Sequence, residues 1–166
     1  MATFEVSDFY TVPIKVSEKG FKTFDRPAIA SWIKSDPILS GNGVYVFSIK
    51  AGKGCKPWYI GKAERQTFSK EAFNARNQLQ IQDVINDQKG TLLVQFITQV
   101  KARGKPNLSQ VREIETFLIG LAAERNHKLI NIHGTKKPDW VLNGVINTGK
   151  GKPTKIQSEF KRLMGI

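Results

Sequence analysis

One glutamate in the most clearly helical segment of the chain is placed to bind a metal ion. Residues 108–125 predict a helix, and at about 100° per residue its apolar side chains form one stripe: Val111, Ile114, Leu118, Leu121 and Ala122. Glu115 lies at the edge of this stripe, whereas Glu113 and Glu124 fall on the opposite face. A partly buried carboxylate is costly unless it is paired or bound to a cation, and a lone carboxylate is a common ligand for Mg²⁺. The helix geometry alone favours the alternative, an ion pair between Glu115 and an arginine or lysine.

Two tyrosines are placed to meet on one face of a predicted β-hairpin. The runs GVYVFSI (residues 43–49) and PWYIG (residues 57–61) are rich in β-branched and aromatic residues, and AGKGCK (residues 51–56) suits an exposed turn between them. Tyr45 and Tyr59 lie on the two strands, each beside a glycine-containing segment that lets a backbone or a ligand come close. Their phenols could therefore converge on one face. An ordinary cross-strand aromatic pair is the alternative, and the hairpin pattern alone favours it.

The residues of these two strands closely resemble the paired signature of the GIY-YIG nuclease family. Gly43-Val44-Tyr45 is followed, after thirteen residues, by Tyr59-Ile60-Gly61 and then Lys62. Valine replaces the isoleucine of the first motif, and the stretch between the motifs is slightly longer than is usual in the family. The resemblance covers residues 43–133. It implies an α/β (α+β) fold with a small central, mostly antiparallel sheet flanked by helices, and it implies metal-dependent hydrolysis of DNA.

The same resemblance implies a role for each candidate residue. Glu115 would hold one Mg²⁺ or Mn²⁺ at the scissile phosphate. Tyr45 would take or relay the proton of the attacking water, with Lys62 as the neighbouring cation that lowers the cost of a phenolate. Tyr59 would position or hydrogen-bond the phosphate. Asn131, in the strand-like run KLINIH (residues 128–133), would organise the site.

An arginine that clamps the phosphate is also implied, but the place it commonly occupies after the second motif holds Ser69 and Lys70. Arg65 and Arg76 are the two alternatives. Arg65 is closer to the motif, and Arg76 lies within residues 68–87, which predict one helix or two short ones. The sequence does not choose between them. If both side chains point outward, the expected function becomes that of a catalytically inactive nucleic-acid-binding protein that retains the fold.

The charge of the chain favours a polyanionic partner. Lysine and arginine number 26 against 14 aspartates and glutamates, which leaves a net charge of +12. Residues 1–42 are neutral, with five basic and five acidic side chains, so residues 43–166 hold the whole excess, with 21 basic and 9 acidic side chains. Such an excess usually marks nucleic-acid binding, although an anionic membrane surface is a weaker alternative. The family resemblance implies that the nucleic acid is DNA. Whether the chain acts as a monomer or a homodimer is open.

The expected organisation is one compact domain with three parts. Residues 1–42 mix β-type sequence with a short helix at residues 27–35, and they predict an extension packed on the core. Residues 43–133 are the expected nuclease-like core, with a third strand at residues 91–100. Residues 134–166 are the expected basic extension. No apolar run is long enough to span a membrane. A single cysteine, Cys55, excludes an internal disulfide, and the N-terminus lacks a secretory pattern, so we expect a cytoplasmic protein. Cys55 and two histidines are too few for a structural zinc site.

Overall fold

The computed structural model describes residues 3–100, 107–131 and 151–164. The chain divides into two compact units, residues 1–132 and residues 133–166, and each is described by itself. The boundary expected between the core and the basic extension, at residues 133/134, lies outside the described residues.

The first unit is built on an antiparallel β-sheet. Its members are β1 (Thr3–Val6), β2 (Tyr10–Thr11), β5 (Gly43–Ala51), β6 (Gly54–Ala63) and β7 (Thr91–Val100). They lie in the order β1-β7-β5-β6, β2 also pairs with β7, and every pair is antiparallel. A separate two-stranded sheet joins β3 (Ile14–Val16) to β4 (Lys22–Phe24). The second strand of the motif hairpin, β6, is therefore an edge strand of the main sheet.

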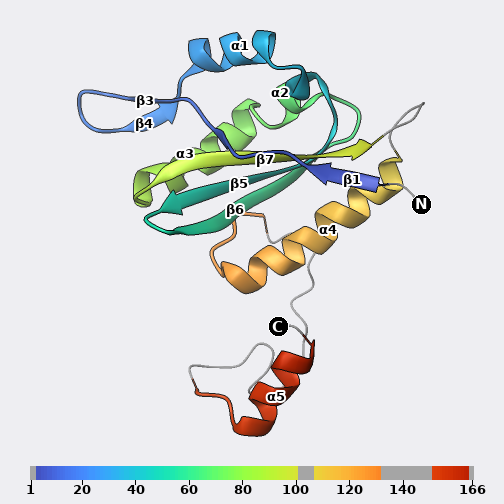
Figure 1. Cartoon of the computed structure of the whole chain (residues 1–166). Coiled ribbons are helices and arrows are strands. Elements are labelled where there is room, and N and C mark those ends of the chain that lie inside the picture. Colours follow the sequence, from blue (N-terminus) through green and yellow to red (C-terminus); the bar gives the residue numbers. More distant parts are fainter. Residues whose placement is uncertain (1–2, 101–106, 132–150, 165–166) are drawn as a thin grey trace. The chain divides into compact units, whose positions relative to one another are not determined.

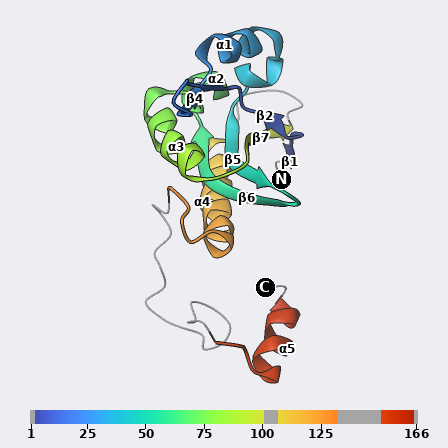
Figure 2. The same ribbon diagram turned by 90° about the vertical axis from the view of Figure 1, so that its left-hand side faces the viewer.

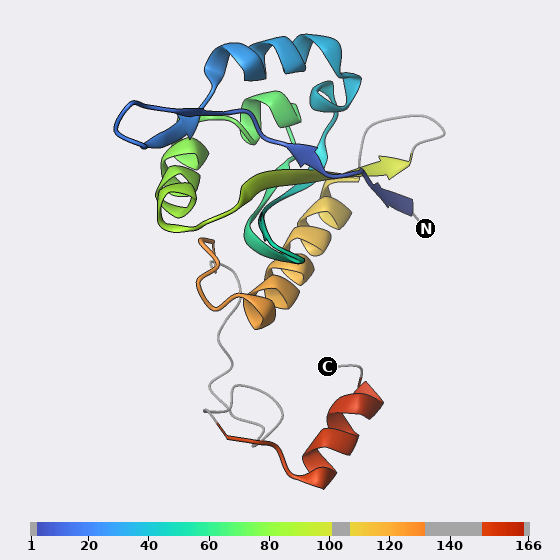
Figure 3. The same cartoon turned by 60° about the vertical axis from the view of Figure 1, so that its left-hand side comes forward.

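Helices cover both faces of this sheet. α1 (Arg26–Ser35), the 3₁₀ turn η1 (Pro37–Ser40), α2 (Phe68–Glu71) and α3 (Ala75–Asp87) lie on one side, and α4 (Leu108–Arg125) lies on the other (Figure 1). Figure 2 shows α1 and α2 together on their side of the sheet, and Figure 3 shows the sheet between α3 and α4. The expected α+β architecture, a mostly antiparallel sheet flanked by helices, is confirmed.

The alternation of side chains along the strands divides the interior into two apolar layers. The larger layer lies under α1, α2 and α3, and it includes Tyr45, Phe47, Phe68, Ile81 and Phe96. The smaller layer lies under α4, and it includes Val44, Ile60, Ile97, Val111 and Ile119. Side chains of neighbouring positions in the motif hairpin thus enter different layers.

The helices begin where side chains cap them. Asp25 accepts a hydrogen bond from the Ala28 N–H at 3.1 Å and precedes Pro27, and Asn74 accepts one from the Asn77 N–H at 2.8 Å. Asn107 accepts one from the Gln110 N–H at 3.3 Å, so α4 begins and ends at the predicted residues. The sequence left open whether residues 68–87 form one helix or two, and the structure has two, α2 and α3.

The glycine of the first motif is required by the contact between β5 and β7. Gly43 has φ of +144°, a conformation that side chains disfavour, and a Cβ there would overlap the carbonyl oxygen of Ile97. Gly43 also lies opposite Thr98 in the β5–β7 register. A residue with a side chain would push the two strands apart at the start of the motif.

Two predictions of detail were wrong. Leu121 was expected in the buried stripe of the helix, but it is 50% exposed, and Ile119 is buried at 4%. The packed face is therefore rotated toward Ile119, which brings Glu115 from the edge of that face to its middle. The predicted strand at residues 128–133 is not formed over its described part, residues 128–131, which is mostly turn. One main-chain hydrogen bond, from the Ile130 N–H to the Trp58 carbonyl oxygen at 2.9 Å, and the Asn131 amide meet the edge of β6 in place of a paired strand. Residues 132–133 lie outside the described part.

The second unit contains α5 (Lys155–Met164). Three apolar side chains at i, i+4 and i+7 spacing are exposed on this helix: Ile156, Phe160 and Leu163. Within the described residues, no helix is both long enough and apolar enough to cross a membrane.

Candidate active site at the edge strand

The motif hairpin brings the two tyrosines onto one face of the sheet. The rings of Tyr45 and Tyr59 stack with centroids 6.1 Å apart and planes inclined by 24°. Tyr45 lies directly opposite Gly61 in the β5–β6 register, and Tyr59 lies opposite Phe47. Because Gly61 lacks a Cβ, the Tyr45 ring can lie against its backbone. The second motif glycine is therefore what makes room for the first motif tyrosine.

An asparagine that the sequence analysis missed joins the two phenols. The Asn77 Nδ2 atom donates to Tyr45 Oη at 2.8 Å and to the Glu71 carbonyl oxygen at 2.7 Å, and Tyr59 Oη donates to Asn77 Oδ1 at 3.0 Å. Asn77 is only 3% exposed. One signal could have revealed it: Asn77, Ile81 and Ile85 are spaced by four along α3, so an amide occupies the apolar stripe of this helix.

The environment keeps both phenols neutral at ordinary pH. Tyr45 is 2% exposed, and burial raises its pKa far above the usual value. Burial also raises the pKa of Tyr59. The neighbouring Tyr45 hydroxyl and, less strongly, the positive charge of Arg76 act against this rise, whereas the negative charges of Glu115 and Glu71 act in the same direction as burial. The role expected of Tyr45, taking a proton from water, therefore has to overcome burial of the acceptor itself.

Glu115 is paired with Lys62 on the other face of β6. The Lys62 ammonium contacts Glu115 Oε2, and the side chains of the two residues are 36% and 13% exposed. The ion pair that the helix geometry favoured is thus present. The described residues contain no group of three or more histidine, cysteine, aspartate or glutamate side chains that could hold a metal ion. Any metal ion here would depend on one carboxylate, water and the oxygens of a substrate.

The position of β6 at the sheet edge allows groups from both faces to act together. Tyr59 lies on the α3 side of this strand and Lys62 on the α4 side, yet the field of Glu115 reaches Tyr59. Between them, Asn131 pairs with the free edge: its Oδ1 accepts from the Ile60 N–H at 3.1 Å, and its Nδ2 contacts the Ile60 carbonyl oxygen. The asparagine amide thus satisfies backbone groups that an additional strand would otherwise pair.

The two candidate arginines have different surroundings. Arg76 is the second residue of α3 and immediately precedes Asn77, and its charge influences the Tyr59 phenol. The charge of Arg65 influences Glu64, which is held by Arg112 through two hydrogen bonds of 2.6 and 3.0 Å. Both arginines are exposed, which is the arrangement that the sequence associates with a nucleic-acid-binding protein without catalysis. The charge of Arg76 therefore acts on the pKa of Tyr59, whereas that of Arg65 acts on the pKa of Glu64.

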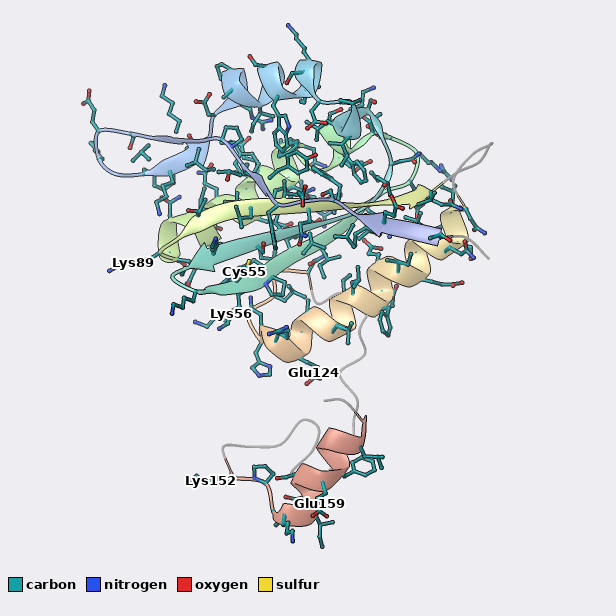
Figure 4. The ribbon with its side chains drawn as sticks, viewed as in Figure 1. Cys55, Lys56, Lys89, Glu124, Lys152 and Glu159 are labelled. Carbon is teal, nitrogen blue, oxygen red and sulfur yellow. The ribbon has the colours of Figure 1, made fainter. Side chains whose placement is uncertain are left out.

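The hollows near the tip of the motif hairpin lie away from these groups. One, with a volume of about 300 Å³, is lined by residues that include Lys56, Trp58 and Lys89, and another is lined by residues that include Phe9 and Lys50. Figure 4 labels Cys55, Lys56 and Lys89 at this end of the sheet. None of the sequence-predicted site residues lines either hollow.

The structure thus places Tyr45, Tyr59 and Asn77 together on the α3 side of the second motif and pairs Lys62 with Glu115 on the α4 side, with Asn131 at the strand edge. The charge of Arg76 acts on the Tyr59 phenol, and that of Arg65 acts on Glu64. In comparisons with known proteins, no family model, curated protein or solved structure matches this chain.

Proposed function

We propose that this chain is a metal-dependent DNA endonuclease that hydrolyses phosphodiester bonds through an active site of the GIY-YIG type. The observation that carries the proposal is the clustering around Tyr59. Its phenol stacks on Tyr45, bonds to Asn77 and lies within the fields of Arg76 and Glu115. These groups supply a cation, a carboxylate and hydroxyls, which are the kinds of group that phosphodiester cleavage uses.

Cleavage of a phosphodiester needs charge stabilisation on the phosphate and orientation of the attacking water. Arg76 is exposed on the first turn of α3, and its planar guanidinium suits two oxygens of one phosphate. Lys62 adds a second cation on the other side of β6, where its side chain is 36% exposed. The net charge of +12 favours the approach of a nucleic-acid backbone to these groups.

Glu115 is the residue that would hold Mg²⁺ or Mn²⁺. A single carboxylate fits Mg²⁺, which commonly binds through one or two carboxylates together with water and substrate phosphates. When bound, such an ion would counter the negative charge that develops at the phosphate and the leaving oxygen. In the structure, the Lys62 ammonium forms an ion pair with the Glu115 carboxylate. We therefore expect metal affinity to be low without DNA and to rise when a phosphate draws the lysine away.

The Lys62–Glu115 pair also favours a second candidate function, that of a nucleic-acid-binding protein without catalysis. A carboxylate permanently neutralised by an ammonium would not bind Mg²⁺, and a phenol as buried as Tyr45 cannot meet water without a local opening. In this alternative the basic residues would bind the phosphate backbone, and no bond would be cut.

Cleavage of supercoiled plasmid, short duplexes and branched DNA separates the two functions. The purified chain is incubated with Mg²⁺, Mn²⁺ or EDTA, beside Glu115→Gln and a matched control, Glu113→Gln. Glu113 belongs to the same helix but is exposed. The nuclease proposal expects metal-dependent cutting that Glu115→Gln loses and Glu113→Gln keeps. Salt-sensitive binding without cutting in any metal would instead support the binding protein.

A further inference from the structure

We infer that Asn77 is a positioning residue that gives the two motif tyrosines different tasks: it holds Tyr45 as an internal hydrogen-bond acceptor and turns Tyr59 into an acceptor for the attacking water. The inference rests on the proposed function, because the water in question is the one that attacks the phosphate. In this inference the tyrosine of the second motif, Tyr59, is the one that contacts the attacking water.

The orientation of the Asn77 amide follows from its third partner. A main-chain carbonyl oxygen only accepts hydrogen bonds, so the Asn77 atom that lies 2.7 Å from the Glu71 carbonyl oxygen must be the nitrogen. The other amide atom is therefore the oxygen, and it also only accepts. Tyr59 Oη, 3.0 Å away, must then donate its single proton to Asn77.

This arrangement limits what each phenol offers to a ligand. Since the proton of Tyr59 is committed to Asn77, the Tyr59 oxygen presents only lone pairs elsewhere. Phosphate oxygens of a diester also present only lone pairs, so the two would not bond to one another. A water molecule can donate to Tyr59 Oη, and its own lone pair is then free to be aimed at phosphorus. This replaces the phosphate-positioning role that the family resemblance implies for Tyr59.

Tyr45 is unsuited to the same task. Its oxygen accepts the Asn77 N–H at 2.8 Å, its own hydroxyl has the Glu71 carbonyl oxygen at 3.5 Å, and its side chain is 2% exposed. Tyr59, by contrast, is only partly buried. The charged side chains whose fields reach the phenols come from three helices: Glu71 of α2, Arg76 of α3 and Glu115 of α4.

The geometric half of the inference is tested without any substrate. In ¹H–¹⁵N spectra, the Asn77 side-chain amide should exchange slowly with solvent. Tyr45→Phe removes an acceptor from Nδ2 and Tyr59→Phe removes the donor to Oδ1, so each should shift this amide resonance. Leu79→Gln on the exposed side of α3 is the control, since Leu79 is 66% exposed. An amide that exchanges freely, or that neither tyrosine change moves, would overturn the positioning role.

The catalytic half is tested by plasmid cleavage under single-turnover conditions. Tyr59→Phe should lower the cleavage rate about ten-fold or more, and Tyr45→Phe should lower it by less than about three-fold, because Tyr45 would contact neither the attacking water nor the phosphate. Equal losses, or a larger loss in Tyr45→Phe, would overturn the division of tasks. Circular dichroism and unfolding curves show that each variant is folded.

Asn77→Asp adds a pH signature, which is measured only over the pH range in which circular dichroism shows the variant folded, so that a loss of structure is not taken for a loss of positioning. An ionised carboxylate can still accept the hydrogen bond from the Tyr59 hydroxyl, but it cannot donate one to the Tyr45 oxygen. A protonated carboxyl has one O–H group and can donate again. Burial raises the pKa of such a carboxyl, so the variant should recover activity relative to wild type as the pH falls. A constant ratio of variant to wild-type rate across the pH range would count against the inference.

The two proposals can fail separately. If the wild-type chain cuts no DNA with any metal while the Asn77 amide responds to both tyrosine changes, the nuclease function and the water-orienting role fall together and the buried bridge remains. If DNA is cut but Tyr59→Phe cuts as fast as wild type, the nuclease function stands and the task assigned to Tyr59 is wrong.

Discussion

Replacing Gly61 by alanine should destabilise the motif hairpin. A Cβ at this position would lie 2.5 Å from Cζ and 2.8 Å from Cε2 of Tyr45, and it would overlap the hydroxyl. The Tyr45 ring has little freedom to retreat, because it packs edge-on against Phe47 and Phe68 and stacks on Tyr59. Forcing one extra carbon into such a packed site typically costs about 1–3 kcal/mol. At about 2–4 °C per kcal/mol for a chain of this size, the melting temperature should fall by about 2–12 °C.

The matched control is Gly120→Ala in the middle of α4. A Cβ there has no heavy atom within 4 Å, so the gain in helix propensity, about 0.8–1 kcal/mol, should raise the melting temperature. Thermal unfolding followed by circular dichroism compares the two. A double variant, Gly61→Ala with Tyr45→Leu, should be less destabilised than the sum of the single changes, since the shorter side chain removes the overlap. Additive losses, or a Gly61→Ala variant as stable as wild type, would refute the steric argument.

Three further predictions follow from the same site and its surroundings. Burial raises the pKa values of Tyr45 and Tyr59 above the unfolded value of about 10. The stability that the two residues contribute is therefore complete below that pH and is lost as the pH rises above it. The melting temperature should decline in alkali, and it should decline less steeply in Tyr45→Phe. Asn131→Ala leaves backbone groups of the buried Ile60 without partners, so urea unfolding should show a loss of about 1–3 kcal/mol, whereas His127→Ala at an exposed position should change little. If DNA runs along β6 to the hairpin tip, changing the exposed Lys53, Lys56 and Lys89 to glutamine should lower the slope of log affinity against log salt by about 0.9 for each lost phosphate contact; a matched triple at Lys15, Lys19 and Lys34, also exposed, should leave the slope nearly unchanged in fluorescence titrations with EDTA.

Local sequence signals were sufficient for most of the elements around the site. Two runs rich in β-branched and aromatic residues around a polar turn predicted the hairpin, and the Asn107 cap with its following apolar residues predicted α4 at its observed bounds. These features depend on neighbours within a few residues, where backbone sterics and capping hydrogen bonds decide the outcome. The hairpin pattern likewise allowed Tyr45 and Tyr59 to share a face, and the register of β5 and β6 decides that they do.

Which face of α4 is buried could not be obtained in the same way. The helix carries apolar side chains on more than half of its circumference, including the exposed Phe117 and Leu121, so the sequence periodicity allows several rotations about its axis. Packing against the β5–β6 hairpin selects the rotation that buries Ile119 and brings Glu115 to Lys62. The choice depends on the shape of a surface assembled from distant strands.

What the sequence determined by itself is the set of reactive residue types and their order along the chain: two tyrosines beside glycines, a following lysine, a glutamate on a helix and an excess of positive charge. Only the tertiary structure decided their partners. It placed Asn77 between the phenols, associated Arg76 with Tyr59 while Arg65 lies beside Glu64, and used Asn131 to satisfy the edge of β6. The physical reason is that a hydrogen bond or an ion pair depends on positions set to within about an ångström by elements that are separated along the chain, and no local pattern records those positions.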